Sequence, residues 1–186
     1  INLMTTFKQT SREVVNDLGF LKLMKNNLIE ETTNTEFDRY CLDHIGACAV
    51  LPVMKNGDVV LIQQYRSALN REIVEVVAGK LDIEGEDLVE CCKRELLEEV
   101  GVVARKFIQL GSWEVSPGWT DEIEHGFLAL DCDEPVETQP DGIEEKFSTV
   151  IRISLDEAMN YIEQGIISDA ISTLVIERAY KYLASN

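Results

Sequence analysis

The sequence predicts an α/β fold in which helices cover a mixed β-sheet. Three observations predict this class. From residue 46 onward, apolar runs of strand length follow one another, and several are rich in β-branched residues. One amphipathic helix interrupts them at about 86–100, and two more helices close the chain. Because so few helices alternate with the strands, few β-α-β units can form, and we expect a sandwich around a mixed sheet.

Composition and charge limit the classes of function. The chain has 34 acidic against 17 basic residues, a net charge of −17, which argues against nucleic-acid binding through a basic patch. A small phosphate-bearing ligand stays compatible, because a bound metal ion reverses the local charge. The five cysteines are irregularly spaced, which predicts reduced thiols in a cytoplasmic protein. No apolar run approaches the roughly 18 residues of a membrane-spanning helix, so we expect no membrane partner.

Residues 1–45 are predicted to form a separate small β unit, and residues 46–186 the main domain. Short strands are expected at 20–24 and 37–42, with the polar residues 25–35 separating or partly extending them. A few strands bury little apolar surface by themselves. We therefore expect this unit to pack on the main domain or on a partner chain.

The elements of the main domain follow in order. Strands are predicted at 47–54, 59–66, 71–77, 107–113, 124–130 and 147–153, with an Asn-Gly turn at 55–58 and a long acidic loop at 131–145. The last two helices are expected at about 155–164 and 169–183. Their predicted N-caps are Ser154, with Glu157 at the capping-box position, and Ser168.

The helix at 86–100 is predicted from strong helix formers and an apolar stripe, and Gly101 is its expected C-cap. Its carboxylates Glu95, Glu98 and Glu99 share one face in the last turns, where the helix dipole favours cations. Each like-charge pair costs about 0.2–0.5 kcal/mol. A solvated acidic face is one interpretation. The other is a divalent cation, Mg²⁺ or Mn²⁺, because hard cations prefer oxygen ligands.

The stretch 79–102 resembles the Nudix box, the signature of the Nudix hydrolase family. That motif reads Gly, five residues, Glu, seven residues, then Arg-Glu-aliphatic-any-Glu-Glu-any-Gly-aliphatic. Here Gly79, Glu86 and the run RELLEEVGV at 94–102 take those positions. Six residues instead of five separate Gly79 from Glu86. We interpret this as a one-residue insertion in the loop before the helix, with the helix register kept.

Other stretches resemble the ADP-ribose pyrophosphatase branch of that family. They are RYCLDHIGA at 39–47, QQYR at 63–66, EVVAGK at 75–80 and SPGWTDE at 116–122. Val77 departs from the branch, which usually has proline there. The resemblance implies a Nudix α/β/α sandwich with a mixed sheet. It also implies a homodimer in which residues 1–45 form a swapped dimerisation unit.

The resemblance also implies a reaction, the metal-dependent hydrolysis of a nucleoside diphosphate linked to another moiety. The expected metal ligands for Mg²⁺, which Mn²⁺ can replace, are the carbonyl of Ala78 with Glu95, Glu98 and Glu99. Arg94 is expected to orient the glutamates through a salt bridge, with Glu86 as a partner. Glu144 is favoured as general base over Glu145, although both also suit a solvated loop. The expected substrate-binding residues are Arg66, Ser116, Pro117, Gly118, Trp119 and Glu122.

Three functions fit this pattern. The leading hypothesis is hydrolysis of ADP-ribose to AMP and ribose 5-phosphate. A broader nucleoside diphosphate sugar hydrolase, acting for example on GDP-mannose or ADP-glucose, is the second. The third is a non-catalytic regulator that binds a nucleotide sugar. Such regulators tend to lose the glutamates of the box, whereas this chain keeps all four. His44 and His125 are isolated in the sequence, and we expect structural roles for them.

Overall fold

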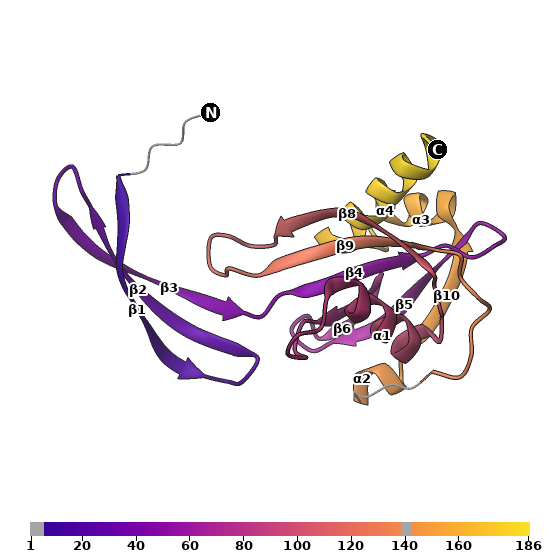
Figure 1. The fold of residues 1–186 in the computed structure, drawn as a ribbon, viewed down its shortest axis with the longest axis horizontal. Coiled ribbons are helices and arrows are strands. Elements are labelled where there is room, and N and C mark those ends of the chain that lie inside the picture. The colour runs from indigo at the N-terminus through magenta and orange to yellow at the C-terminus, as the bar shows by residue number, and fades with distance from the viewer. Residues whose placement is uncertain (1–5, 139–142) are drawn as a thin grey trace. The chain divides into compact units, whose positions relative to one another are not determined.

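The computed structural model describes residues 6–138 and 143–186, which fall into two compact units (Figure 1). The first unit contains the residues up to Ile45 together with Glu114–Ile123. The second unit contains Gly46–Trp113 and Glu124–Asn186. Each unit is described by itself below. Among the residues described, no helix is both long enough and apolar enough to cross a membrane.

The first unit is built on a three-stranded antiparallel sheet in the order β1-β2-β3, formed by Phe7–Asp17, Leu21–Glu30 and Thr35–His44. The predicted short strands at 20–24 and 37–42 were too short, because β2 and β3 pair without interruption from Leu21 with His44 to Glu30 with Thr35. The sequence prediction missed β1 altogether. Every residue of β1 is exposed, so the strand lacks the alternation that a buried face imposes.

The segment 114–123 is attached to the end of β3. The amide of Leu42 donates to the carbonyl oxygen of Trp119 at 2.7 Å, and the amide of Asp121 donates to that of Leu42 at 3.3 Å. Arg12 of β1 adds ion pairs to Asp43 at 2.9 Å and to Asp121 at 2.6 Å. The segment therefore folds as part of the first unit.

The second unit contains two sheets. The mixed sheet has the order β7-β4-β9-β8, formed by Val77–Lys80, Ala47–Pro52, Ile123–Leu130 and Lys106–Glu114. Strand β4 is antiparallel to β7 and parallel to β9. The other sheet is antiparallel, in the order β10-β5-β6, formed by Thr149–Ser154, Asp58–Arg66 and Arg71–Glu75. The predicted single strand at 71–77 is thus divided between the two sheets at Val76.

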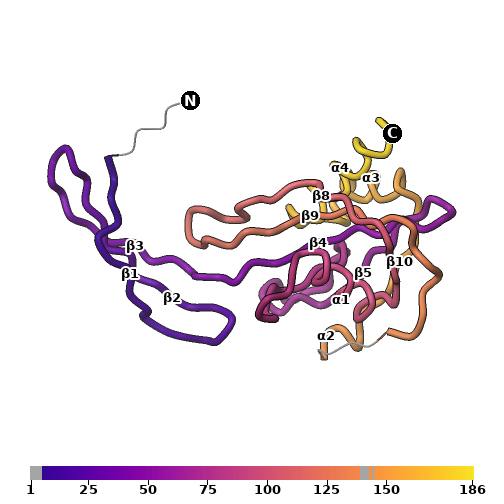
Figure 2. Tube along the Cα trace, viewed as in Figure 1, coloured from indigo at the N-terminus to yellow at the C-terminus, as the bar shows by residue number. Residues whose placement is uncertain are grey.

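Helices cover both faces of the mixed sheet (Figures 1 and 2). Cys48 and Val50 of β4 belong to the core beneath α1, which spans Leu88–Val100. Gly126, opposite Ala49 in the register, faces α4, which spans Ala170–Ala184, because a Cβ there would lie 2.9 Å from Val175. Helix α3, Leu155–Glu163, packs against α4. The predicted helix-covered mixed sheet is confirmed.

The helix caps match the sequence prediction with one correction. The Ser154 hydroxyl accepts the Glu157 amide at 3.1 Å and begins α3, as predicted. Helix α4 is capped by Asp169, whose carboxylate accepts the Ser172 amide at 2.7 Å, and not by the predicted Ser168. A carboxylate one residue later lies closer to the first free amides and to the positive end of the dipole. A short helix α2, Ile143–Lys146, lies in the predicted loop at 131–145.

Candidate active site

Gly79 and Glu95 fit together where β7 passes beside α1. A Cβ on Gly79 would lie 1.8 Å from both Cδ and Oε1 of Glu95, so the carboxylate occupies the space that a side chain would fill. Glu95 is buried as a result. Position 79 therefore requires glycine, because only a residue without a Cβ lets the buried carboxylate of Glu95 lie directly against the backbone of β7.

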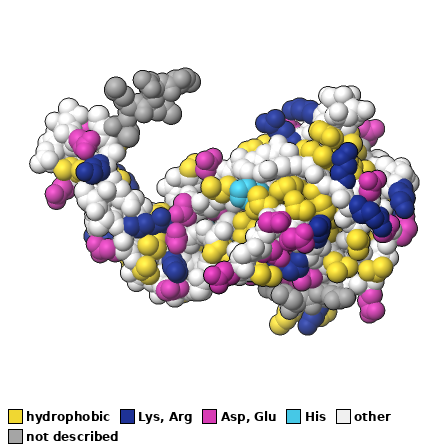
Figure 3. Space-filling model, viewed as in Figure 1, with side chains coloured by type: hydrophobic (Ala, Val, Ile, Leu, Met, Phe, Trp, Pro, Cys, Tyr) yellow, Lys and Arg dark blue, Asp and Glu magenta, His cyan; other side chains and the backbone are white. Residues whose placement is uncertain are grey.

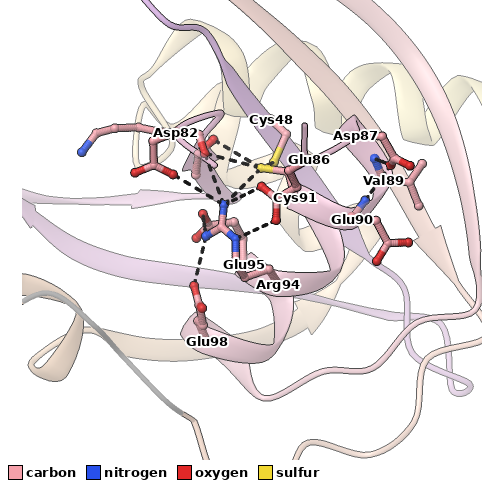
Figure 4. A network of polar contacts seen from close by, with 12 residues as sticks. Cys48, Asp82, Glu86, Asp87, Val89, Glu90, Cys91, Arg94, Glu95 and Glu98 are labelled. Carbon is pink, nitrogen blue, oxygen red and sulfur yellow. Dashed lines mark hydrogen bonds and ion pairs between the residues drawn. The ribbon is translucent and has the colours of Figure 1, made fainter. Parts of the chain in front are cut away.

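Arg94 links four carboxylates, those of Asp82, Glu86, Glu95 and Glu98, and the ion pair with Asp82 is the longest at 3.9 Å (Figure 4). Its Nε and Nη2 donate to the two oxygens of Glu86, both at 3.0 Å. Its Nη1 donates to Oε1 of Glu95 at 2.5 Å and to Oε2 of Glu98 at 3.2 Å. The hydrogen bonds that Arg94 donates to Glu86, followed by the charge of Glu95, raise the pKa of Arg94. The predicted orienting role of Arg94, with Glu86 as its partner, agrees with this geometry.

The extra residue before the helix is accommodated in a turn. The amide of Glu86 donates to the carbonyl oxygen of Ile83 at 3.1 Å, and Gly85 adopts a positive φ of 80°. Asp87 then caps α1, accepting the amides of Val89 and Glu90 at 2.9 Å. The helix thus begins at Leu88 with Glu86 still facing Arg94.

Glu99 is the second buried carboxylate of the helix. Its Oε2 accepts the backbone amide of Ala78 at 3.3 Å. Burial, reinforced by the charges of Glu95 and Glu145, raises the pKa of Glu99 to about 9. Burial also raises the pKa of Glu95 to about 7, although Arg94 opposes the shift. Neighbouring protein groups therefore compensate the negative charges of Glu95 and Glu99 only partly.

The carboxylates of Glu95, Glu98 and Glu99 are donors of the type that suits a divalent cation. Within the described residues, no three acidic, cysteine or histidine side chains form a ready-made metal centre, and Arg94 holds both Glu95 and Glu98. The donors available are nevertheless carboxylate oxygens, the type that Mg²⁺ and Mn²⁺ prefer. A buried carboxylate pair with raised pKa values needs either protons or a cation. The donor chemistry of these residues therefore suits a hard divalent cation, and their role as metal ligands stays a prediction.

Arg66 lies at the end of β5 in an ion pair with Glu75 of β6. The distance from Nε to Oε1 is 2.8 Å, and Glu75 is buried. The charge of Arg66 also opposes the rise in the pKa of Glu99, which places the guanidinium within electrostatic reach of the acidic pair. Sequence reasoning assigned no role to Glu75 or to the buried Gln64. The signal for both was a polar residue inside an otherwise apolar strand.

The two candidate general bases lie in α2. The charge of Glu145 raises the pKa values of both Glu95 and Glu99, so this carboxylate lies on the side of the acidic pair. The side chain of Glu144, the favoured candidate, lies outside the part of the chain that the structure describes. The choice between the two therefore stays a prediction.

The remaining predicted substrate residues belong to the first unit. Ser116, Pro117 and Gly118 form a turn in which the carbonyl oxygen of Ser116 accepts the amide of Trp119 at 3.0 Å. The Trp119 side chain is exposed. Glu122 pairs with His44, with Oε1 to Nδ1 at 3.1 Å. His125, in the second unit, contacts the Ser112 hydroxyl at 2.8 Å.

The comparison with known proteins identifies the family. The sequence profile described as NUDIX domain matches residues 43–171, so this chain belongs to the Nudix family. An ADP-ribose pyrophosphatase of Bacillus subtilis is 36% identical over 139 residues, 75% of this chain and 74% of that protein. A methanol dehydrogenase activator of Bacillus methanolicus is 35% identical over the same shares. A GDP-mannose pyrophosphatase of Cronobacter sakazakii is 28% identical over 71% of each chain.

A solved structure confirms the fold. The crystal structure of an ADP compounds hydrolase matches with a TM-score of 0.84 and 18% identity, covering 98% of this chain and 96% of that one. The family and fold predictions are thus confirmed. So is the prediction that the chain is an enzyme of the Nudix pyrophosphohydrolase class. The box at 79–102 lies in the second unit, and its residues stay the predicted active site.

Proposed function

We propose that this chain hydrolyses the pyrophosphate bond of ADP-ribose, giving AMP and ribose 5-phosphate, with Mg²⁺ as its metal. The observation that supports this most directly is the intact acidic site: Glu95 and Glu99 are buried beside β7 and Arg94 orients the glutamates. The similarity to an ADP-ribose pyrophosphatase favours ADP-ribose as substrate. The similarity to a GDP-mannose pyrophosphatase keeps the broader nucleoside diphosphate sugar hydrolase as the alternative.

In this proposal the carboxylates of Glu95 and Glu99 hold the cation, with Glu98 and the carbonyl of Ala78 as further ligands. The ion would polarise the diphosphate oxygens and make bound water more acidic. Arg94 keeps Glu95 and Glu98 in place through its Nη1 donor. Glu86 accepts hydrogen bonds from Nε and Nη2 of Arg94. This bidentate contact holds the guanidinium in the orientation in which Nη1 faces Glu95 and Glu98.

Arg66 would bind the pyrophosphate. Its Nε is occupied by Glu75 at 2.8 Å, which fixes the plane of the guanidinium and leaves its terminal nitrogens for a phosphate oxygen. The charge balance also favours this role. An anionic substrate near Glu95 and Glu99 needs a cation of the protein besides the bound metal.

Glu145 would accept the proton of the attacking water. The support for Glu145 is electrostatic: its charge acts on both Glu95 and Glu99 and raises their pKa values. The matched variants Glu144→Gln and Glu145→Gln separate the two candidates. We expect Glu145→Gln to lower kcat by about 10²–10⁴-fold, the range of general base catalysis, and Glu144→Gln to change it little. The reverse result would move the base to Glu144.

A hydrolysis panel tests the substrate. Purified protein with Mg²⁺ is given ADP-ribose, ADP-glucose, GDP-mannose or a dinucleotide, and products are separated by chromatography. We expect the highest kcat/KM for ADP-ribose, with AMP and ribose 5-phosphate in equal amounts. Glu99→Gln is the control and should lose more than about 100-fold, since even residues that only support metal ligands cost 10–100-fold. A higher kcat/KM for GDP-mannose would select the alternative, and activity equal to wild type in Glu99→Gln would refute the metal assignment.

The residues Ser116, Pro117, Gly118, Trp119 and Glu122 are proposed to bind the terminal ribose. Their support is the resemblance of SPGWTDE to the ADP-ribose pyrophosphatase branch. Within the first unit this segment is held firmly, because Arg12 pairs with Asp121 and the backbone pairs with Leu42. A fixed turn that presents an exposed indole is suited to stack on a sugar or a base.

A further inference from the structure

Two buried cysteine thiols face each other next to the Arg94 network. Cys48 is the second residue of β4 and Cys91 lies in the first part of α1 (Figure 4). Both residues have no exposed surface, and their Sγ atoms are 2.8 Å apart. Both are free thiols. The sequence analysis predicted reduced thiols but did not predict that two of them meet.

The pair is connected to the active site through Cys91. Its Sγ lies 3.7 Å from Nη2 of Arg94 and 3.7 Å from the carbonyl oxygen of Lys80. Cys48 is the register partner of Gly79, the glycine that makes room for Glu95. Neither sulfur has a part in the hydrolysis proposed above, so that reaction does not explain why two thiols meet here.

We propose that Cys48 and Cys91 are a modification site, a dithiol that a peroxide converts to an internal disulfide joining β4 to α1. A disulfide has a sulfur–sulfur bond of about 2.05 Å, whereas the two Sγ atoms are now 2.8 Å apart. The bond would fix the beginning of α1 to the sheet, one helical turn before Arg94 and Glu95. The proposal does not depend on which nucleotide sugar is the substrate.

The contacts of Cys91 set its resting state. The hydrogen bond to Cys48, followed by burial, raises the pKa of the Cys91 thiol. Because the thiolate and not the thiol is the nucleophile, the closed pair rests as two thiols. Oxidation therefore requires opening of the first turn of α1. Both sulfurs are buried, but the loop before this turn, 82–85, is exposed, so we infer that opening there admits the peroxide to Cys91.

The chemistry balances with a peroxide as the only oxidant. Hydrogen peroxide transfers one oxygen to the Cys91 sulfur, breaking its O–O bond and releasing water, and gives a sulfenic acid. The Cys48 sulfur then attacks the Cys91 sulfur. The S–S bond forms, the S–O bond breaks, and the leaving hydroxide takes the proton of Cys48 as a second water. Two thiols lose two hydrogen atoms in total, and one peroxide becomes two waters.

The test is a mass measurement on the folded chain. The protein is treated with hydrogen peroxide, the excess is removed with catalase, and the remaining thiols are alkylated in denaturant. We expect two of the five cysteines to escape alkylation, and a non-reduced digest to contain a peptide pair linked through Cys48 and Cys91. Dithiothreitol should restore alkylation of both. A product carrying only added oxygen atoms, or no protected pair, would overturn the proposal.

Variants of the neighbouring cysteines supply matched controls. Cys91→Ala and Cys48→Ala should each abolish the protected pair. Cys92→Ala and Cys132→Ala remove other buried thiols and should retain it. A link that maps to Cys92 or Cys132 in the native protein would refute the assignment. If Cys91→Ala does not fold, Cys48→Ala and the digest of the native chain still decide the question.

Discussion

Glu95 and Glu99 are the residues on which the proposed chemistry of this chain depends. Both are buried on the same helix, and burial raises their pKa values to about 7 and about 9. A folded state that must hold both charges without a cation is destabilised. In the proposed function the same property would favour a bound cation, because the cation would replace a proton on the carboxylates.

The pH dependence of metal stabilisation follows from these pKa values. In the unfolded chain the two carboxyls have ordinary pKa values near 4.5. Their folded-state values are higher, so the destabilisation is absent below the unfolded pKa and grows as the pH rises through about 7 and about 9. We expect the Tm of the protein in EDTA to fall between pH 6 and pH 9, and the gain in Tm from Mg²⁺ to rise over that range.

Glu99→Gln is the control for this experiment, since it removes the group with the more strongly raised pKa. Its Tm in EDTA should depend less on pH than that of the wild type. Differential scanning fluorimetry with matched ionic strength measures both. A gain from Mg²⁺ that is constant across the range would contradict the prediction.

Gly79→Ala tests the close approach of β7 and α1. The new methyl group would overlap the Glu95 carboxylate, which must move by more than an ångström. Misplacement of about 1 Å costs about 100-fold in rate, so we expect that loss in kcat/KM with a smaller loss in stability. Gly57→Ala is a control in open space, although its positive φ adds backbone strain. Activity in Gly79→Ala close to wild type would show that Glu95 is not held at this position.

At the scale of the element, helix α1 has an unfavourable distribution of charge, which Arg94 and the residues at its ends offset. Its last turn has no basic residue, and its acidic residues are gathered towards the C-terminal end. The compensation comes from Arg94 and from the left-handed Gly101, whose amide bonds the carbonyl oxygens of Leu96 and Leu97. Glu86, which precedes the helix, holds Arg94 in place by accepting two of its hydrogen bonds.

Replacing Arg94 with lysine tests this arrangement. An ammonium group cannot make the bidentate contact with Glu86 and also reach Glu95 and Glu98. We expect Arg94→Lys to lower activity and Mg²⁺ affinity about 10–100-fold, as changes behind metal ligands do. Steady-state kinetics at varied Mg²⁺ measures both effects.

Arg105→Lys is the matched control for that variant. Arg105 also pairs with a carboxylate through both terminal nitrogens, that of Asp133, but the pair is exposed. Exposed ion pairs contribute about 0–1 kcal/mol, so this variant should keep its activity. Equal losses in the two variants would indicate a general effect of removing a guanidinium.

The sequence predicted the elements best where burial imposes a pattern. The stripe of α1, the strands of the mixed sheet and the caps at Ser154 and Gly101 all follow from local chemistry. Strand β1 was missed because both of its faces are exposed. Glu75 was missed as a site residue because its role depends on Arg66, a partner on the neighbouring strand that no local pattern indicates.

At the scale of the whole molecule, the N-terminal sheet raises the question of assembly. Large apolar side chains of this sheet are exposed, among them Phe7, Val14, Val15, Phe20 and Tyr40. Such exposure is costly for an isolated sheet and favours a partner surface. A swapped homodimer, predicted from the family resemblance, would provide that surface.

Deleting residues 1–45 tests the dimer prediction. The chain that remains should be poorly soluble or should fail to form a dimer, because the predicted dimerisation unit is gone. Light scattering coupled to size exclusion measures the mass of both forms. A truncated chain that stays an active, stable dimer would refute the swapped arrangement. Arg12→Ala in the full chain is a milder variant that breaks the pairs with Asp43 and Asp121 while keeping the sheet.

The turn at 83–86 accommodates the extra residue between Gly79 and Glu86 and suggests a place for a probe. Glu86 and Arg94 close the site on the helix side, whereas residues 82–85 are exposed. Lys80 and Asp82 of the path between Gly79 and Glu86 contact Arg94, whereas Ile83, Glu84 and Gly85 are exposed. The exposed turn at 83–85 is therefore the place where a short peptide label or a fluorescent reporter would be inserted to lie near the Arg94 network.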